Sequence, residues 1–469
     1  MQNFNNLTFS EDGKTVLRCK KDLQGDLFIP EGVSEIGKKA FYGCKNLTSV
    51  VLPSSVTKIG EEAFEECERL TSIKIPDGVT EIGAFSFNGC KSLTSMVIPS
   101  SVKIIGAFAF DGCSNLTSVE ISEGVTEIEA FAFNGCKSLT SIVIPGSVTM
   151  IGYRAFWKCT GLTSVKIPEG VTEIGRCAFE ECIHLTSVVI PSSVKKIGVG
   201  AFAKCDGLTS ANIPDGLTEI KDYTFFCSGL TSFEIPSSVT KIGKSAFAGC
   251  FGIETAKIPD GVTVIGEGAF SDCINLSSVE IPSSVTEIGE MAFMCCEVSL
   301  TSVVIPNGVT AIRSHVFHDC RQLTSVEIPD SVTKIEDGAF WQCISLSSVE
   351  IPSSVTEIGE MAFEYCVSLT SVKIPEGVAK IGKKTFGSCE SLKSIVIPST
   401  VTRIDKTAFE GCSSLEEIHL HHQHPKGFVK AFTNDDIDVS MITLYVPIGS
   451  EDEYRKHPFY KRFGKIVGE

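Results

Sequence analysis

The sequence lacks the features that place a chain in or across a membrane. No apolar run approaches the roughly 20 residues that a membrane-spanning helix needs. The first ten residues, Met-Gln-Asn-Phe-Asn-Asn-Leu-Thr-Phe-Ser, contain neither the basic nor the apolar segment of a secretory signal peptide. We therefore expect no transmembrane segment and a cytoplasmic location.

Basic residues are also few relative to acidic residues. The formal net charge is −16, with 41 Lys and Arg against 57 Asp and Glu. Such an excess of acid favours solubility and opposes binding to phosphate backbones or anionic lipid. We expect no nucleic-acid partner.

Motifs that carry catalysis are missing as well. The chain has no G-x-S-x-G elbow, no phosphate-binding P-loop and no C-x-x-C pair. Serine and threonine are frequent, but they recur as Leu-Thr-Ser in unit after unit, and a nucleophile does not need many copies. We predict a protein that is not an enzyme, with no cofactor and no resident metal.

What the sequence does have is a repeat of 23 residues. Prolines follow this step from Pro30, Pro53 and Pro76 to Pro398, and phenylalanines keep the same step from Phe41 to Phe409. The proline step shortens to 22 before Pro236 and lengthens to 24 before Pro306. A fixed period of this length indicates a solenoid, which grows along one axis without enlarging its core.

One unit runs from Leu47 to Cys67. Its first six residues fit L-x-x-L-x-L, a strand that points Leu47, Val50 and Leu52 inward. Proline ends the strand because it has no N–H for the next ladder bond. We expect Val56, Ile59 and Phe64 to return to the core, the last of these under a short helical or 3₁₀ turn. Glycine at position 60 is interpreted as favoured for compactness and not as strictly required, since five other units carry a charged residue at this position.

Cysteines form a column within this repeat. Of the 20 cysteines, 17 share one repeat position, and Cys19, Cys177 and Cys295 lie outside it. Stacked units would bring the column close to disulfide spacing. Because the column is odd in number and lies in a tight core, we predict reduced, structural thiols.

The unit resembles the BspA-like, or Treponema-type, leucine-rich repeat, with the pattern C-x-x-L-x-x-I-x-I-P followed by V-x-x-I-G-x-x-A-F. The resemblance extends from about Leu27 to Leu420. It implies a leucine-rich-repeat solenoid: a right-handed stack of 17 repeats, with a parallel sheet on the concave face and short 3₁₀ or helical turns on the convex side. It also implies adhesion to host or cell-surface proteins, and with it the alternative of a cell-surface or secreted location.

The two ends depart from the repeat and are predicted to cap it. Residues 1–25 read as a hairpin that turns at Asp12-Gly13, residues 26–420 form the solenoid, and residues 421–469 form the C-terminal cap. In the cap, we expect a strand at 443–447 and a helix that begins at Ser450. We expect a monomer.

Four histidines lie where the last repeat meets this cap: His419, His421, His422 and His424. In an extended segment His419 and His421 share one face, so they could bind a metal ion given a third ligand such as Asp435 or Asp436. The favoured interpretation is a polar, solvated junction loop.

The outward residue at the fifth position of each unit is the predicted centre of a protein-binding face, and we call this series the central column. Unlike the core positions it is not uniform, and in the first half valine alternates with polar residues. After Phe28, the column comprises Val51, Lys74, Val97, Glu120, Val143, Lys166, Val189, Asn212, Glu234, Lys257, Glu280, Val304, Glu327, Glu350, Lys373 and Val396. The exposed valines would give an apolar contact strip, and the acids from Glu280 to Glu350 would suit a basic segment. The alternative is a structural spacer or surface-layer element without a binding face.

Overall fold

The computed structural model describes residues 6–433 and 437–469. The chain divides into two compact units, residues 1–236 (unit 1) and 237–469 (unit 2). Each is a parallel β-solenoid with turns of about 23 residues and almost no helix, as the sequence predicts. Among the described residues, no helix is both long and apolar enough to span a bilayer.

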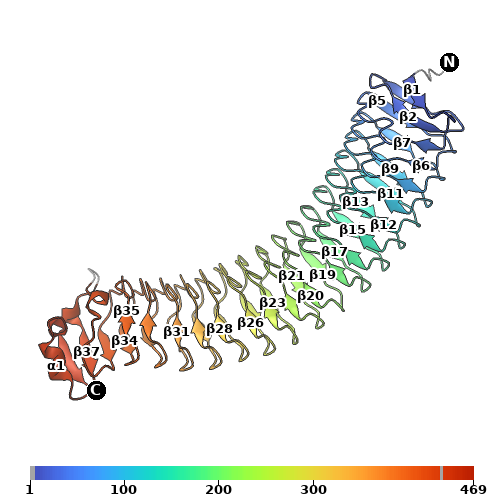
Figure 1. Ribbon diagram of the computed structural model, residues 1–469. Helices are drawn as coiled ribbons and strands as arrows, with labels where there is room; N and C mark the ends of the chain where they lie inside the picture. The colour runs from blue at the N-terminus through green and yellow to red at the C-terminus, as the bar shows by residue number, and fades with distance from the viewer. Residues whose placement is uncertain (1–5, 434–436) are drawn as a thin grey trace. The chain divides into compact units, whose positions relative to one another are not determined.

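Most repeats contribute two short strands, one to each of two different sheets. In unit 1 the first strand of each repeat gives β3 (Gly25–Phe28), β5 (Leu47–Val51), β7 (Ser72–Lys74), β9 (Ser95–Ile98), β11 (Ser118–Ile121), β13 (Ser141–Val143), β15 (Ser164–Lys166), β17 (Ser187–Val189), β19 (Ser210–Asn212) and β21 (Ser232–Glu234). These strands form a three-stranded sheet, β3-β5-β7, and a seven-stranded sheet that runs from β9 to β21 (Figure 1).

The second strand of each repeat is only two residues long. In unit 1 this strand gives β4 (Glu35–Ile36), β6 (Lys58–Ile59), β8 (Glu81–Ile82), β10 (Ile104–Ile105), β12 (Glu127–Ile128), β14 (Met150–Ile151), β16 (Glu173–Ile174), β18 (Lys196–Ile197) and β20 (Glu219–Ile220). Strands β4 to β18 lie in order in one sheet, and its edge is the antiparallel hairpin of β1 (Leu7–Phe9) and β2 (Thr15–Cys19). The cap boundaries at residues 25 and 420 remain a prediction.

Unit 2 repeats the plan with shorter sheets. Its first strands are β23 (Thr255–Lys257), β25 (Ser278–Glu280), β27 (Ser302–Val304), β29 (Ser325–Glu327), β32 (Ser371–Lys373), β34 (Ser394–Ile397) and β36 (Glu417–Leu420). Its second strands are β22 (Lys241–Ile242), β24 (Val264–Ile265), β26 (Glu287–Ile288), β28 (Ala311–Ile312), β30 (Lys334–Ile335), β31 (Glu357–Ile358), β33 (Lys380–Ile381) and β35 (Arg403–Ile404). The sheet of first strands is broken after β25 and after β29.

The C-terminal segment extends the last of these sheets. β37 (Thr443–Val446) pairs with β36, and β38 (Lys465–Gly468) pairs with β37, both in parallel. Between them lie α1 (Glu451–Lys456) and η4 (Tyr460–Arg462), and η2 (Val429–Ala431) and η3 (Val439–Met441) precede β37. Tyr454 on α1 and Tyr460 on η4 are fully buried.

The core contains the side chains that the period predicts. Leu47, Val50, Val56, Ile59 and Phe64 are at most 2% exposed. The core phenylalanines stack in register, with ring centroids 4.9 Å apart for Phe41 and Phe64 and planes within 1° of parallel. Within each unit this column gives each repeat an apolar surface that only its neighbours can cover.

The segment around each core phenylalanine is a series of hydrogen-bonded turns. The N–H of Ala63 donates to the carbonyl of Gly60, which is the 3₁₀ type of bond that the sequence suggests. Glu62 has a φ of 56° and Glu66 a φ of 57°, and these positive values interrupt any helix. The N–H groups of Glu62, Phe64 and Glu66 bond to the following repeat instead.

Candidate functional site

The central column of unit 1 lies along the seven-stranded sheet. Strand pairing places Val97 beside Glu120, and Glu120 beside Val143. The order continues through Lys166 and Val189 to Asn212 and Glu234. Neighbouring strands lie about 4.8 Å apart, so successive valines are separated by about 10 Å.

These valines face solvent. Val143 is 64% and Val189 is 70% exposed, whereas Ile142 and Val188 beside them are buried. The alternation along each strand thus directs the column outward, in the way that strand geometry dictates. Phe28, Val51 and Lys74 hold the same outward position on β3, β5 and β7.

In unit 2 the column is interrupted. Lys257 and Glu280 pair across β23 and β25, with Nζ 4.0 Å from the carboxylate. The column continues with the pair Val304 and Glu327 and with the pair Lys373 and Val396. Glu350 is exposed on a stretch that forms no strand.

Depressions open at both breaks of the unit 2 sheet. One, of about 490 Å³, is lined by residues of β23, β25 and β27 that include Glu280 and Val304. The other, of about 580 Å³, lies beside Glu350 and is also lined by Asp330 and Glu376. Of the three acids predicted to suit a basic segment, Glu280 lines the first of these depressions, Glu350 lines the second, and Glu327 lines neither.

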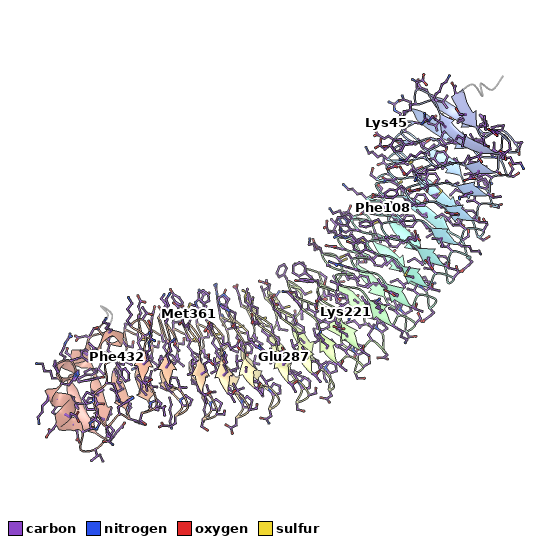
Figure 2. All side chains as sticks on the ribbon, in the orientation of Figure 1. Lys45, Phe108, Lys221, Glu287, Met361 and Phe432 are labelled. Carbon is purple, nitrogen blue, oxygen red and sulfur yellow. The ribbon has the colours of Figure 1, made fainter. Side chains whose placement is uncertain are left out.

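A strip of aromatic side chains on the turns of unit 1 was missed by the sequence reasoning. Phe85, Phe108 and Phe131 stack with centroids 4.5 and 4.4 Å apart, and each is partly exposed. Phe108 is labelled in Figure 2. Tyr153 meets the end of this stack edge-on. The sequence feature that could have revealed this strip is a second phenylalanine two residues before the core phenylalanine in three successive repeats.

The four histidines have different surroundings. His422 is buried and its Nε2 lies 2.7 Å from the carbonyl oxygen of Val401, and burial lowers its pKa. His424 is exposed and pairs with Glu453 at 2.8 Å. The suggested third ligands Asp435 and Asp436 lie outside the described residues.

His419 and His421 do share a face, and a different carboxylate meets them there. Nδ1 of His419 is 2.9 Å from Oε1 of Glu469, and Nε2 of His421 is 3.9 Å from the same oxygen. His419 also stacks on Tyr445, with centroids 4.4 Å apart. Because Glu469 is 50 residues from His419, only the fold could show that they meet.

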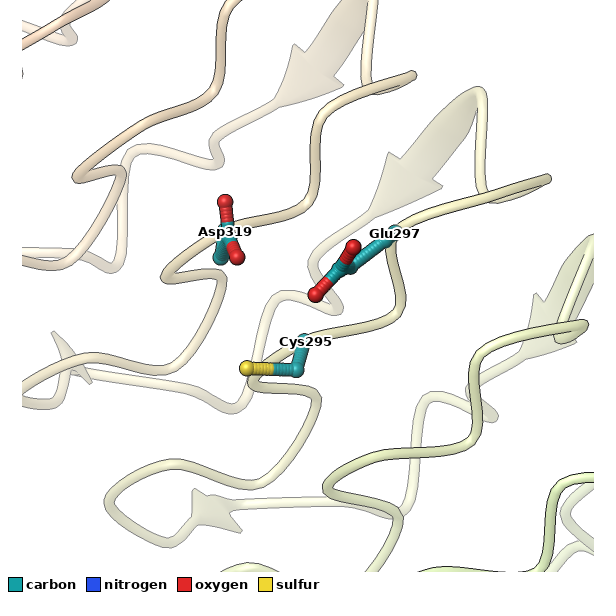
Figure 3. Close-up of side chains that lie close together, drawn as sticks. All are labelled: Cys295, Glu297 and Asp319. Atoms are coloured by element: carbon teal, nitrogen blue, oxygen red, sulfur yellow. The ribbon is translucent and has the colours of Figure 1, made fainter.

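A second cluster combines Cys295, Glu297 and Asp319 (Figure 3). Their potential ligand atoms all lie within 4.8 Å of one another. Arg321 occupies both oxygens of Asp319, with Nε and Nη2 at 2.8 and 3.1 Å. Burial and the nearby carboxylates raise the pKa of Cys295 to about 12, so its thiol stays protonated. The Asp319 carboxylate of this cluster is therefore held in an ion pair with Arg321.

The column cysteines have a structural role that their spacing did not reveal. None of the 20 cysteines, all of which lie within the described residues, forms a disulfide. The Sγ of Cys67 donates to the carbonyl of Phe41, and that of Cys90 to Phe64, each at 3.2 Å. Burial raises the pKa of Cys159 to about 12. Protonated thiols that satisfy core carbonyls link each repeat to the one before it.

Family and structure comparisons agree with this architecture. The model of the BspA type leucine rich repeat region matches residues 34–163, 151–275, 241–367 and 334–445. Comparison with curated proteins gives no match.

Among solved structures, a leucine-rich repeat protein from Bacteroides ovatus is 28% identical, with a TM-score of 0.53 over 94% of this chain and 97% of that one. A leucine rich cell surface protein from Faecalibacterium prausnitzii is 29% identical, with a TM-score of 0.31 over 88% and 92%. A leucine-rich repeat protein from Eubacterium ventriosum is 21% identical, with a TM-score of 0.38 over 78% and 88%. With the family model matched over most of its length, the chain belongs to the BspA-type leucine-rich repeat family.

Proposed function

We propose that the chain is a non-catalytic protein-binding scaffold that contacts its partner through the central column of unit 1. The observation that carries the proposal is the row of exposed valines in register along one sheet. Glu120, Lys166 and Asn212 fill the same position on neighbouring strands, so the fold does not require an aliphatic residue there. Exposed apolar side chains at regular spacing, with charges between them, suit a protein surface of matching pattern.

The test compares two triple variants with the wild-type chain. The face variant carries Val143→Ser, Lys166→Ser and Val189→Ser. The control carries Lys103→Ser, Ile104→Ser and Met150→Ser, which also removes two aliphatic residues and one lysine but on or beside the second sheet. Each tagged protein is incubated with the same cell extract, and the retained proteins are quantified by mass spectrometry.

We expect a set of proteins that wild type and control retain and the face variant loses. If all three retain the same proteins, this face is not the binding surface. If none of the three retains proteins above background, the alternative of a structural spacer is favoured.

Adhesion to host or cell-surface proteins is the finer form of this proposal, and it is supported by the family resemblance. Protease treatment of intact cells, followed by fractionation and detection with an antibody to this chain, tests it. Digestion in intact cells is the expected result for an adhesin. Protection, with the chain in the cytoplasmic fraction, would count against adhesion and direct the partner search to intracellular proteins.

A further inference from the structure

Three donor groups converge where the last repeat meets the C-terminal strands. His419 lies on β36, His421 follows this strand directly, and Glu469 follows β38. The backbone of Glu469 is held in place, because its N–H donates to the carbonyl of Val446 at 2.9 Å. The ring of His419 is held by stacking on Tyr445.

We propose that His419, His421 and Glu469 bind one divalent transition-metal ion, with Zn²⁺ the best match. In tetrahedral Zn²⁺ sites the ligand atoms lie about 2.0–2.2 Å from the metal, which puts neighbouring ligand atoms roughly 3.3 Å apart. The separations from Oε1 of Glu469 to the two imidazoles, 2.9 and 3.9 Å, lie on either side of this value. Forming the site also requires side-chain rotations that bring the two imidazole nitrogens to this spacing from each other.

The groups around the two imidazoles support a metal more strongly than the distances alone. The other nitrogen of His419, Nε2, lies 3.7 Å from a carboxylate oxygen of Glu417. The other nitrogen of His421, Nδ1, lies 3.8 Å from a carboxylate oxygen of Glu376. Each imidazole thus has one nitrogen toward Glu469 and the other toward a second carboxylate. In metal sites outer carboxylates accept the remaining N–H and orient the ring, a role that Glu417 and Glu376 would take by moving from 3.7 and 3.8 Å to hydrogen-bond distance.

The site is accessible. The side chains of His419, His421 and Glu469 are 20, 41 and 36% exposed. A metal ion can enter from solvent and keep water as its remaining ligand. Two imidazoles and one carboxylate favour Zn²⁺, Ni²⁺ or Cu²⁺ over Mg²⁺, which prefers oxygen ligands.

Calorimetric titration of the full-length protein with ZnCl₂ tests the proposal, with MgCl₂ as the reference ion. We expect one Zn²⁺ per chain, and at least a tenfold loss of affinity in His419→Ala and in His421→Ala. Glu376→Gln should weaken binding by about 10-fold, because outer carboxylates typically contribute this much. His424→Ala is the matched control, since it removes a nearby histidine that pairs with Glu453 instead.

Cobalt(II) spectra and thermal unfolding provide independent checks on the result of the Zn²⁺ titration. Bound Co²⁺ should show visible bands without a thiolate charge-transfer band, and Cys295→Ser should leave binding unchanged. Circular dichroism checks that each variant folds. Loss of the site in Cys295→Ser, equal affinity for Zn²⁺ and Mg²⁺, or unchanged binding when both His419 and His421 are replaced would each overturn the proposal.

Discussion

At the scale of single residues, the core phenylalanine column shows how one side chain serves two repeats. Phe202 is fully buried, and its ring stacks on Phe179 at 5.4 Å and on Phe225 at 5.8 Å. Its loss would leave a cavity open to both neighbours. Because repeats are stabilised by their nearest neighbours, the effect should spread beyond one unit.

Phe202→Ala should destabilise the protein by about 3–5 kcal/mol, the usual result of removing a buried phenylalanine. Urea unfolding followed by circular dichroism measures the change. Phe28→Ala is the control, because Phe28 is 47% exposed in the same unit and its loss should cost far less. Similar effects for both variants would show that the phenylalanine column is not the core.

At the scale of elements, the turn segments combine tight packing with left-handed backbone. Lys204 has a φ of 55°, and its counterpart Lys158 a φ of 57°. For residues other than glycine, this conformation costs roughly 1 kcal/mol. The positive φ aligns alternate N–H groups with the next repeat, as in the bond from Lys204 to Phe226.

Lys204→Gly should therefore stabilise the fold by up to about 1 kcal/mol, although glycine usually destabilises regular structure. Lys204→Ala separates the backbone effect from loss of the ion pair with Glu181 and should be close to neutral, since that pair is exposed. Denaturant midpoints of the three proteins give the comparison. A less stable glycine variant would contradict the assigned turn geometry.

At the scale of the molecule, unit 2 ends in strands that cover its last repeat. Phe432 stacks on Phe409 at 5.4 Å, and Tyr454 donates a hydrogen bond to the carbonyl of His422 at 2.8 Å. β37 pairs with β36 along one edge. Without these contacts the last repeat would present an unpaired strand edge and an open apolar core to solvent.

Removal of residues 421–469 should cause self-association of the chain, because exposed strand edges and apolar surfaces pair with those of other molecules. Size-exclusion chromatography with light scattering measures the mass of the truncated and full-length chains. A truncated protein that stays monomeric and unfolds like the full-length one would refute the capping role of this segment.

Repeat spacing alone was enough to predict the solenoid, the inward positions and the outward direction of Val143 and Val189. A period that aligns identical positions leaves one way to bury them all, by stacking. Identical short sequences did not always form the same secondary structure. Residues 276–280 and 346–350 are both Leu-Ser-Ser-Val-Glu, yet the first includes β25 and the second forms no strand. Strand formation at these residues therefore depends on their surroundings in the fold and not on the local sequence.

The sequence by itself determined the repeat, its core and the face that the central column occupies, because these follow from side-chain size and spacing. Only the tertiary structure decided which groups meet outside the period. Glu469 reaches His419 across β37, although the two residues are 50 positions apart in the chain. Such contacts depend on how irregular segments fold back on the regular ones, and no period records that path.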